Sequence, residues 1–299
     1  MVDYDFLRYL EAKQPVDDRA LNRTVADAMK RFVNSSSAGL RIVEVGAGHG
    51  AMVERLAAGG LLRRASYTAI DPDATNIAAA RTRFQTDGRI GALELKRADL
   101  YDYAAVENEA CDLVIAHAVL DLLDLDRALP VLESLCVPGG AFYFTINFDG
   151  DTIFEPTIDH ALDAEIVALY HDTMDNRITD GRRSGHSQTG RRLFGALAER
   201  GAIIEEAGSS DWLVWPRAGG YPGDEAYFLH FIVETVGRAL AGAPDLEAAL
   251  LQRWVAERHA QIERGTLVYL ARQLDFFGRW PTSPTGRRSL PDSGRAPGP

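Results

Sequence analysis

The sequence predicts an α/β fold in which a mainly parallel sheet is covered by helices on both faces. Three observations predict it. Strand-like and helix-like segments alternate between residues 41 and 148, the first apolar run ends in a glycine-rich turn, and the next two strands end in Asp71 and Asp99. Alternating β-α-β units give parallel strands, so the functional residues at their ends should gather at one edge.

Two helices are predicted before the sheet, within residues 3–33. Apolar residues such as Leu7 and Leu10 recur at helical spacing. We expect residues 15–18, which begin with a proline, to break the run and to cap the second helix. Residues 1–35 are therefore predicted to form an N-terminal helical lid.

The central region alternates short apolar strands with amphipathic helices. We predict strands at residues 41–45, 66–73, 92–99, 111–120 and 140–148, with helices at residues 50–60, 73–85 and 127–136. The turn Pro138-Gly139-Gly140 stops the last of these helices. Residues 36–148 are the predicted ligand-binding core.

The second half of the chain adds helices to the sheet. We predict helices at residues 158–175, 191–200, 224–240 and 246–263, strands at residues 202–208, 211–216 and 266–280, and a polar loop at residues 176–190. Residues 149–280 would thus complete the sheet and insert helices. The tail at residues 281–299 is rich in proline, glycine, serine and arginine, and is expected to be disordered.

Composition and charge limit the partners of the chain. Its 299 residues carry a formal net charge of −11, with a pI of about 5.1. A nucleic-acid-binding domain usually has a basic face, so this charge argues against a DNA or RNA substrate. The sequence has no run of about 18 apolar residues, and its first residues lack the apolar core of a signal peptide. We expect a soluble, cytoplasmic protein with no membrane partner.

The cysteines indicate neither a disulfide framework nor a metal site. Cys111 and Cys136 are the two cysteines, and each stands in an apolar run. Both are expected to be buried thiols, and the histidines and cysteines show no spacing typical of metal ligands. We therefore predict no metal ligands.

A glycine turn and two aspartates carry the functional prediction. Gly46, Gly48 and Gly50 follow the first strand, and glycine permits a tight turn and close approach of a ligand to the backbone. In open parallel sheets, ligands lie beyond the carboxyl ends of the strands. Asp71 could accept hydrogen bonds from both ribose hydroxyls of an adenosine, and Asp99 from an adenine amino group. Each aspartate alone could instead cap a helix.

In their order along the chain, these motifs resemble those of the class I S-adenosylmethionine-dependent methyltransferases. An acid, Glu44, stands two residues before Gly46. The fourth-strand motif at residues 112–117 (DLVIAH) and the turn Pro138-Gly139-Gly140 also match. The resemblance covers roughly residues 40–148 and implies a Rossmann-like sheet that binds S-adenosylmethionine. Residues 1–35 and 149–280 more loosely resemble the acceptor-binding parts of small-molecule methyltransferases.

The resemblance also implies roles for individual residues. Glu44 would organise the turn near the methionine amino group, Asp71 would hold the ribose, and Asp99 would contact the adenine. The implied cofactor-binding residues are Glu44, Gly46, Ala47, Gly48, Asp71, Pro72, Asp99, Leu100 and His117.

Methyl transfer can depend mainly on proximity and alignment, because the sulfonium of the cofactor already activates the methyl group. A general base is needed only where the acceptor must lose a proton. His117 is the first candidate, since imidazole titrates near neutral pH; it could equally be a histidine hydrogen-bonded at a strand end. Asp149 and His160 are further catalytic candidates, and Arg191–Arg192 could receive a carboxylate or phosphate on the acceptor or lie in a surface loop.

Alternatives stay open at this point. The fingerprint Gly46-x-Gly48-x-x-Ala51 with Asp71 also suits an NAD-dependent oxidoreductase, although no hydride-transfer dyad is recognisable. A non-catalytic protein that binds S-adenosylmethionine would carry the same motifs. Methylation of a protein or of RNA is a further alternative, and the acidic charge makes RNA the less attractive acceptor. The sequence does not identify the acceptor, nor whether methylation is on oxygen, nitrogen or carbon. The helices at residues 224–263 could cap the site or form the face of a homodimer.

Overall fold

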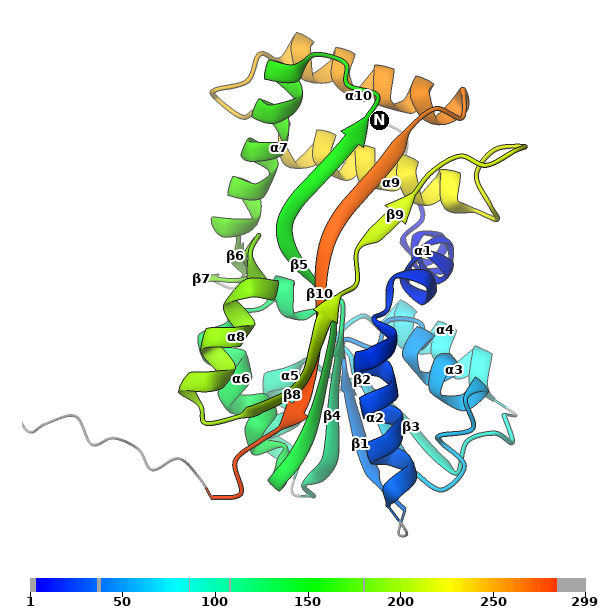
Figure 1. Ribbon diagram of the computed structural model, residues 1–299, viewed down its shortest axis with the longest axis vertical. Coiled ribbons are helices and arrows are strands. Elements are labelled where there is room, and N and C mark those ends of the chain that lie inside the picture. Colours follow the sequence, from blue (N-terminus) through cyan, green and yellow to red (C-terminus); the bar gives the residue numbers. More distant parts are fainter. Residues whose placement is uncertain (1–3, 37–38, 86, 108, 180, 284–299) are drawn as a thin grey trace, which may run out of the picture.

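The centre of the computed structural model is an eight-stranded sheet (Figure 1). The structure describes residues 4–36, 39–85, 87–107, 109–179 and 181–283. The strands of the sheet are β1 (Arg41–Val45), β2 (Ser66–Asp71), β3 (Ala92–Arg97), β4 (Cys111–His117), β5 (Cys136–Glu155), β8 (Ile203–Ser209), β9 (Trp212–Val214) and β10 (Val268–Arg279). A separate antiparallel pair consists of β6 (Ile178–Thr179) and β7 (Arg182–Arg183).

The helices lie before, between and beyond these strands. They are α1 (Phe6–Ala20), α2 (Arg23–Ser35), α3 (Ala51–Ala58), α4 (Ala74–Phe84), α5 (Leu100–Val106), α6 (Leu125–Ser134), α7 (His160–Asp175), α8 (Thr189–Glu199), α9 (Glu225–Ala239) and α10 (Ala248–Glu263), with a short 3-10 helix, η1 (Leu120–Leu122). A helix of the predicted lid, α1, crosses over the carboxyl ends of the parallel strands (Figure 1).

The strand order confirms the predicted mainly parallel sheet. It is β3-β2-β1-β4-β5-β10-β8, and β9 pairs with β10. The first five of these strands pair in parallel, whereas β10 is antiparallel to both β5 and β8. The carboxyl ends of β1, β2, β3 and β4 therefore meet at one edge, as the sequence predicts.

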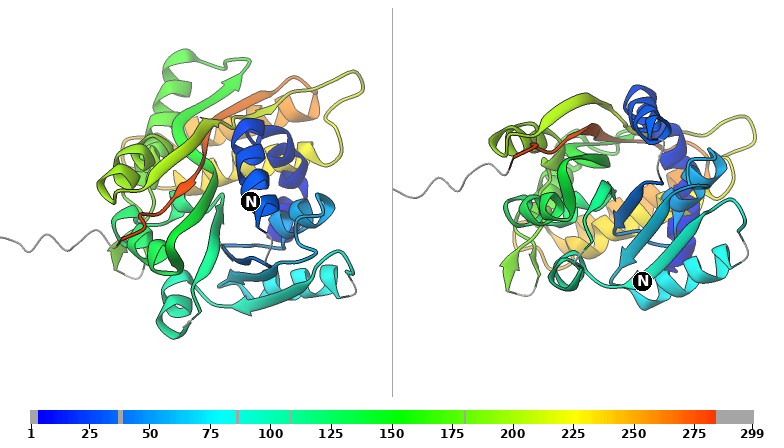
Figure 2. Two further views of the ribbon diagram at one scale, coloured as in Figure 1. Left: turned by 60° about the horizontal axis from the view of Figure 1, so that its bottom comes forward. Right: turned by 90° about the horizontal axis from the view of Figure 1, so that it is seen from below.

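Alternating residues send apolar side chains to both faces of the sheet, which helices cover (Figure 2). On one face, Ile42 and Ile115 pack with residues of α2 and α3. On the other, Val43 and Val114 pack with residues of α6 and α8. Because successive residues of a strand point to opposite faces, a strand buried on both sides is a near-continuous apolar run.

A second layer extends from β5 and β10 beyond the parallel part of the sheet. These two strands pair along most of their length, from Ala141 with Arg279 to Glu155 with Val268. Above that edge they pack with β9 and with α1, α7, α9 and α10 around a third apolar core. The helices predicted at residues 224–263 therefore belong to this layer (Figure 1).

Three local predictions were wrong. The helix α1 continues through Pro15 and ends at Ala20, and Asn22 rather than residues 17–18 caps α2. The buried face of α1, with Ala12 and Val16, stabilises this path despite the amide that proline lacks. The helix α5 was not predicted, and β5 continues past residue 148 to Glu155 because β10 pairs with it there.

Both cysteines are buried, as predicted, and they remain free thiols with their Sγ atoms 3.4 Å apart. Within the described residues, no helix is both long and apolar enough to cross a membrane. In the same part of the chain, no three His, Cys, Asp or Glu side chains are placed to hold a metal ion. Most of the predicted disordered tail, residues 284–299, lies outside the described residues.

Candidate functional site

The strand β1 ends in a turn of three glycines with left-handed backbone. The φ angle is +68° at Gly46, +55° at Gly48 and +86° at Gly50, and α3 begins directly after the turn. A Cβ on Gly46 would lie 2.7 Å from Cγ2 of Val119, and one on Gly50 would lie 2.5 Å from Cε2 of Phe84. Backbone conformation and space therefore both favour glycine at these two positions.

Asp71 fastens this turn to the end of β2. Its Oδ2 accepts a hydrogen bond from the Gly48 amide at 2.8 Å, and its Oδ1 accepts from the Asp73 amide at 2.9 Å and from Nδ2 of Asn76 at 3.1 Å. A carboxylate offers about four acceptor positions, so one remains on Oδ2. The residue fits the ribose-binding role, and it also holds the glycine turn in shape.

The residues predicted on the adenine side lie at the neighbouring strand end. Asp99 is exposed and caps α5, since its Oδ1 accepts from the Asp102 amide at 2.7 Å. Leu100 behind it is buried, and Pro72 is exposed beside Asp71. The Ala47 amide donates a hydrogen bond to the carbonyl of Ile70 in β2 at 3.0 Å. The structure thus brings these residues together at the ends of β1, β2 and β3.

Glu44 lies buried in β1, two residues before the turn. Its Oε2 accepts a hydrogen bond from Oη of Tyr67 at 2.8 Å. Burial raises the pKa of Glu44 to about 8. This effect of burial outweighs the hydrogen bond from Tyr67 and the charge of Arg55, which both lower the pKa. The carboxyl group is therefore largely protonated at neutral pH and can both donate and accept hydrogen bonds.

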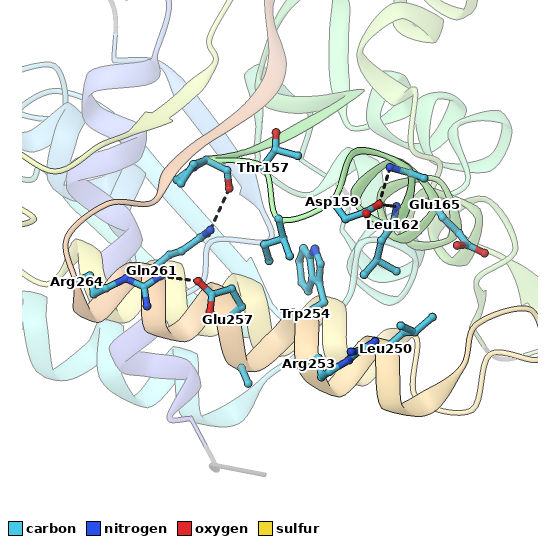
Figure 3. A pocket seen from close by; sticks show the side chains of 14 residues that line it. Thr157, Asp159, Leu162, Glu165, Leu250, Arg253, Trp254, Glu257, Gln261 and Arg264 are labelled. Carbon is cyan, nitrogen blue, oxygen red and sulfur yellow. Dashed lines mark hydrogen bonds and ion pairs between the residues drawn. The ribbon is translucent and has the colours of Figure 1, made fainter.

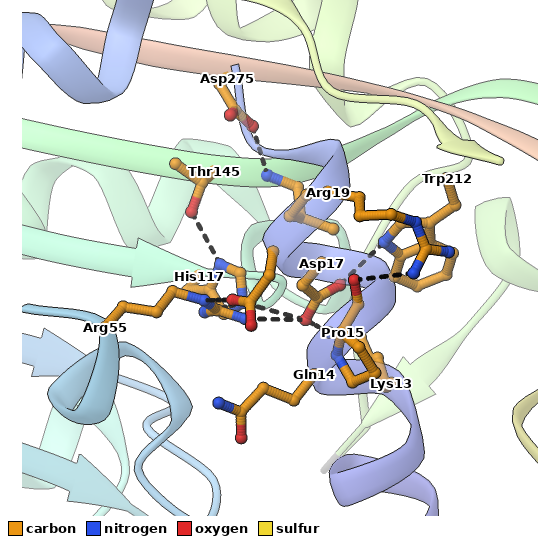
Figure 4. Close-up of polar contacts among 12 residues, drawn as sticks. Lys13, Gln14, Pro15, Asp17, Arg19, Arg55, His117, Thr145, Trp212 and Asp275 are labelled. Atoms are coloured by element: carbon orange, nitrogen blue, oxygen red, sulfur yellow. Dashed lines mark hydrogen bonds and ion pairs between the residues drawn. The ribbon is translucent and has the colours of Figure 1, made fainter. Parts of the chain in front are cut away.

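His117, at the end of β4, is held by partners from three other elements (Figure 4). Its Nδ1 lies 2.8 Å from Oγ1 of Thr145, and its Nε2 lies 3.1 Å from Oδ2 of Asp17 and 3.0 Å from Nη1 of Arg55. Burial and the charge of Arg55 lower the pKa of His117 to about 4. The ring is thus neutral at physiological pH, and both nitrogens are engaged.

Asp17, on the buried face of α1, joins this helix to His117. Its carboxylate also contacts Nζ of Lys13 at 2.5 Å and Nε1 of Trp212 at 2.8 Å. Burial would raise the pKa of Asp17, but the charge of Lys13 and the contacts with His117 and Arg55 hold it well below its usual range. Lys13 and Arg55 supply the positive charge, so an ionised Asp17 is compatible with a neutral His117.

The other two predicted catalytic residues do not lie with His117. Asp149, further along β5, accepts hydrogen bonds at Oδ1 from the amide and Nε of Arg191, at 2.6 and 2.9 Å. His160 is exposed at the first position of α7. Arg191 is therefore occupied by a carboxylate of the chain itself, and the predicted catalytic trio is dispersed.

Sequence reasoning missed the connection between α1 and the strand ends. Lys13 and Asp17 are one helical turn apart and both lie on the buried face of their helix. Charged residues rarely occupy such positions without partners. This pairing on an otherwise apolar stripe was the signal that could have located the polar cluster.

Asp121, in η1, presents a shielded and unsatisfied oxygen. Its Oδ1 is inaccessible to solvent and has no hydrogen-bond partner among the described residues, although the residue as a whole is partly exposed. Burial raises the pKa of Asp121, and a hydrogen bond from its own backbone amide and the charges of Arg177 and Lys13 oppose this. Burial raises the pKa values of Tyr9 and Tyr170, and the negative charge of Asp121 adds to both shifts.

A large recess lies elsewhere. It has a volume of about 1160 Å³ and runs between the segment at residues 156–165 and the helix α10, with Trp254 in its wall (Figure 3). No residue of the glycine turn lines it. A smaller recess, about 560 Å³, lies between α1, α4 and His49 of the turn. Size alone therefore does not locate the site.

The fold and the strand-end residues define a class of protein. The order β3-β2-β1-β4-β5-β10-β8 with one antiparallel strand, a glycine turn after β1 and acids after β2 and β3 make a Rossmann-like domain of the class I methyltransferase type. Residues 43–144 match the family model described as "Methyltransferase domain". This part of the chain is therefore similar to a methyltransferase domain.

Solved structures of similar shape include three bacterial proteins. A SAM-dependent methyltransferase from Thiobacillus denitrificans in complex with S-adenosyl-L-homocysteine is 14% identical, with a TM-score of 0.45 over 86% of this chain and 92% of that one. The cyclopropane synthase MmaA2 from Mycobacterium tuberculosis is 12% identical, with a TM-score of 0.47 over 84% and 83%. The YcgJ protein from Bacillus subtilis is 10% identical, with a TM-score of 0.49 over 86% and 99%. No curated protein sequence matches the chain.

Proposed function

We propose that the protein transfers a methyl group from S-adenosylmethionine to a small-molecule acceptor. The grouping of Asp71, Asp99 and the glycine turn at adjacent strand ends, within a methyltransferase domain, carries this proposal. When bound, the cofactor supplies a methyl group that its sulfonium has already activated. The chain must then bind and orient the two reactants and exclude water.

The cofactor roles follow from position and hydrogen-bonding capacity. Asp71 would hold the ribose through the acceptor position left on Oδ2, with Pro72 beside it. Asp99 and Leu100 would contact the adenine. Glu44, Gly46, Ala47, Gly48 and His117 are proposed to surround the methionine end, since they lie at the ends of β1 and β4.

The lid supports a small acceptor. Cδ1 of Leu10 in α1 would lie 3.5 Å from a Cβ on Gly48, so α1 reaches over the turn. A bulky acceptor would have to displace this helix, which Asp17 ties to His117. The negative charge of the chain also favours an acceptor other than a nucleic acid. The proposal also includes a cytoplasmic location and a homodimer formed through α9 and α10.

We propose a general-base role for Asp121 and a positioning role for His117. Asp121 has an oxygen without a partner and a raised pKa, so it is our candidate to accept a proton from a hydroxyl or amine of the acceptor. Both nitrogens of His117 have partners, and this favours a positioning role in which it anchors α1 through Asp17. Asp149 is not favoured as a general base, because Arg191 engages its carboxylate. His160 is not favoured either, because it is exposed at the beginning of α7.

The test is parallel calorimetric titration with S-adenosylmethionine, S-adenosylhomocysteine and NAD, followed by turnover with methyl-labelled cofactor and a panel of small acceptors. We expect binding of the first two ligands at about micromolar Kd and no heat from NAD. Binding of NAD alone would overturn the proposal in favour of hydride transfer. Binding of S-adenosylmethionine without label transfer to any acceptor class would indicate a non-catalytic binding protein.

A further inference from the structure

A pocket of about 320 Å³ lies where the β6–β7 pair meets the beginnings of α5 and α6. Its walls combine arginines, hydroxyls and apolar side chains. The lining residues are Tyr101, Leu122, Leu123, Asp124, Arg127, Thr179, Arg182, Arg183 and Ser184. The volume is at the lower end of the range for small-molecule sites.

The charge of the pocket is positive in an acidic protein. Arg127, Arg182 and Arg183 stand against one carboxylate, Asp124, so the lining has a formal charge of +2, whereas the whole chain carries −11. Asp124 already caps α6, with its Oδ1 accepting from the Asp126 amide at 3.1 Å. Three guanidinium groups around one recess repel one another unless an anion joins them.

These arginines lack the carboxylate partners that many other arginines of the chain have. In the part of the chain that the structure describes, no ion pair involves Arg127, Arg182 or Arg183. Arg89, in contrast, is paired with Glu54 at 2.8 Å. The guanidinium of Arg127 instead lies 4.6 Å from the ring centre of Tyr101. The donors of the pocket are thus available to a ligand.

The position of the pocket connects it with the proposed cofactor site. Tyr101 follows Asp99 and Leu100 in the first turn of α5, and the negative charge of Asp99 contributes to the raised pKa of Tyr101, after burial and together with Asp124. On the other wall, Leu122 belongs to η1, the helix that carries Asp121. A ligand in the pocket would therefore lie beside both the adenine side and the acceptor side of the strand ends.

We propose that this arginine pocket binds the anionic group of the methyl acceptor, a phosphate or carboxylate carried on a small organic body. Guanidinium groups bind such anions through paired charge-assisted hydrogen bonds. The hydroxyls of Thr179 and Ser184, 2.7 Å apart, add donors beside them. Leu122, 46% exposed, and the ring of Tyr101 offer contact for the organic body. The assignment to the acceptor rests on the proposed function; the binding of an anion does not.

The experiment uses phenyl phosphate, phenylacetate and benzylammonium as probes, titrated calorimetrically into the full chain with and without S-adenosylhomocysteine. The test variant, Arg127→Gln/Arg182→Gln/Arg183→Gln, removes the three charges of the pocket. The matched control, Arg23→Gln/Lys30→Gln/Arg31→Gln, removes three exposed charges from α2 and leaves the same net charge. Equal melting temperatures of the two variants establish that both are folded.

We expect at least one of the two anions to bind, about tenfold or more weakly in the test variant, with the control unchanged and benzylammonium silent in every protein. Phenyl phosphate binding without phenylacetate binding assigns a phosphorylated acceptor, and the reverse assigns a carboxylate. Equal anion binding by the test variant and the control, or no binding of either anion, would refute the proposal that this pocket binds an anion.

Two further readouts separate the pocket from the proposed function. If the protein binds the anion probes but does not bind S-adenosylhomocysteine, the methyltransferase proposal is refuted and the assignment of an anion-binding pocket stands. A short single-stranded RNA that binds more tightly than phenyl phosphate, and loses this binding in the test variant, would overturn the assignment to a small molecule.

Discussion

Replacing Asp71 by alanine is expected to weaken the binding of S-adenosylmethionine by about 10- to 100-fold. A hydrogen bond to a charged group contributes about 1.5–3 kcal/mol, and about 1.4 kcal/mol corresponds to a tenfold change in Kd. The loss of the proposed ribose contact accounts for this range. The variant also removes three internal acceptors, for the Gly48 and Asp73 amides and for Nδ2 of Asn76. The turn itself should therefore loosen.

Two companion variants separate these effects. Asp71→Asn keeps the size of the side chain, but an amide nitrogen in place of Oδ2 cannot accept from the Gly48 amide, so its affinity should be as low as that of the alanine variant. Asp73→Ala removes only the cap of α4, where Oδ1 accepts from the Thr75 amide at 2.6 Å, at a cost of about 1 kcal/mol in stability. Its cofactor affinity should stay unchanged.

Calorimetric titration with S-adenosylhomocysteine, performed well below the melting temperature of each variant, measures the outcome. Wild-type affinity in a folded Asp71→Ala protein would refute the placement of the ribose. A drop of equal size in Asp73→Ala would show that helix capping, and not the ribose contact, determines the affinity.

Three further predictions follow from the residues beside the lid. His117→Ala should lower turnover more than the affinity for S-adenosylhomocysteine; equal turnover with a true acceptor would exclude both a catalytic and a positioning role. Asp121→Asn should reduce kcat at least about tenfold if it accepts a proton, with cofactor affinity intact, and an unchanged pH profile of kcat would contradict this. Burial lowers the pKa values of His49 and His117 to about 4, below about 6.5 in the unfolded chain. Each of these histidines therefore takes up its proton in the unfolded state first, so its own contribution to the free energy of unfolding should fall as the pH drops from 6.5 to 4, by about 1.4 kcal/mol per pH unit. The raised pKa of Glu44 contributes with the opposite sign. Denaturant titrations of wild type and His117→Gln isolate this contribution: between pH 6.5 and 4 the two slopes of unfolding free energy against pH should differ by one proton, and equal slopes would argue against a neutral, buried ring.

The sequence predicted the parallel sheet and the grouping of the strand-end residues well because their signals are local. Each strand is a short apolar run, and the conformation of Gly46 and the position of Asp71 depend on residues close along the chain. Parallel pairing then brings the strand ends together without further information. The residues implied by the resemblance accordingly lie side by side.

The polar cluster beneath the lid depends on contacts between distant residues. Asp17 meets His117 and Trp212, which are 100 and 195 residues away along the chain. No local pattern encodes those distances, so the role of α1 was predicted only as that of a lid. The continuation of β5 was missed for the same reason, since its partner β10 comes more than a hundred residues later.

The ribbon formed by β5 and β10 restricts how the protein can open. The strand β5 crosses the predicted boundary at residues 148–149 without interruption, and its ladder with β10 joins the parallel sheet to the upper layer. A hinge between the two halves would have to break this ladder, whereas α1 is attached through side chains such as Asp17 to Trp212 and Arg19 to Glu225. Access to the strand ends therefore costs less by detaching one helix than by bending the whole molecule, and the rate at which ligands enter would depend on the polar contacts and the apolar packing of that helix.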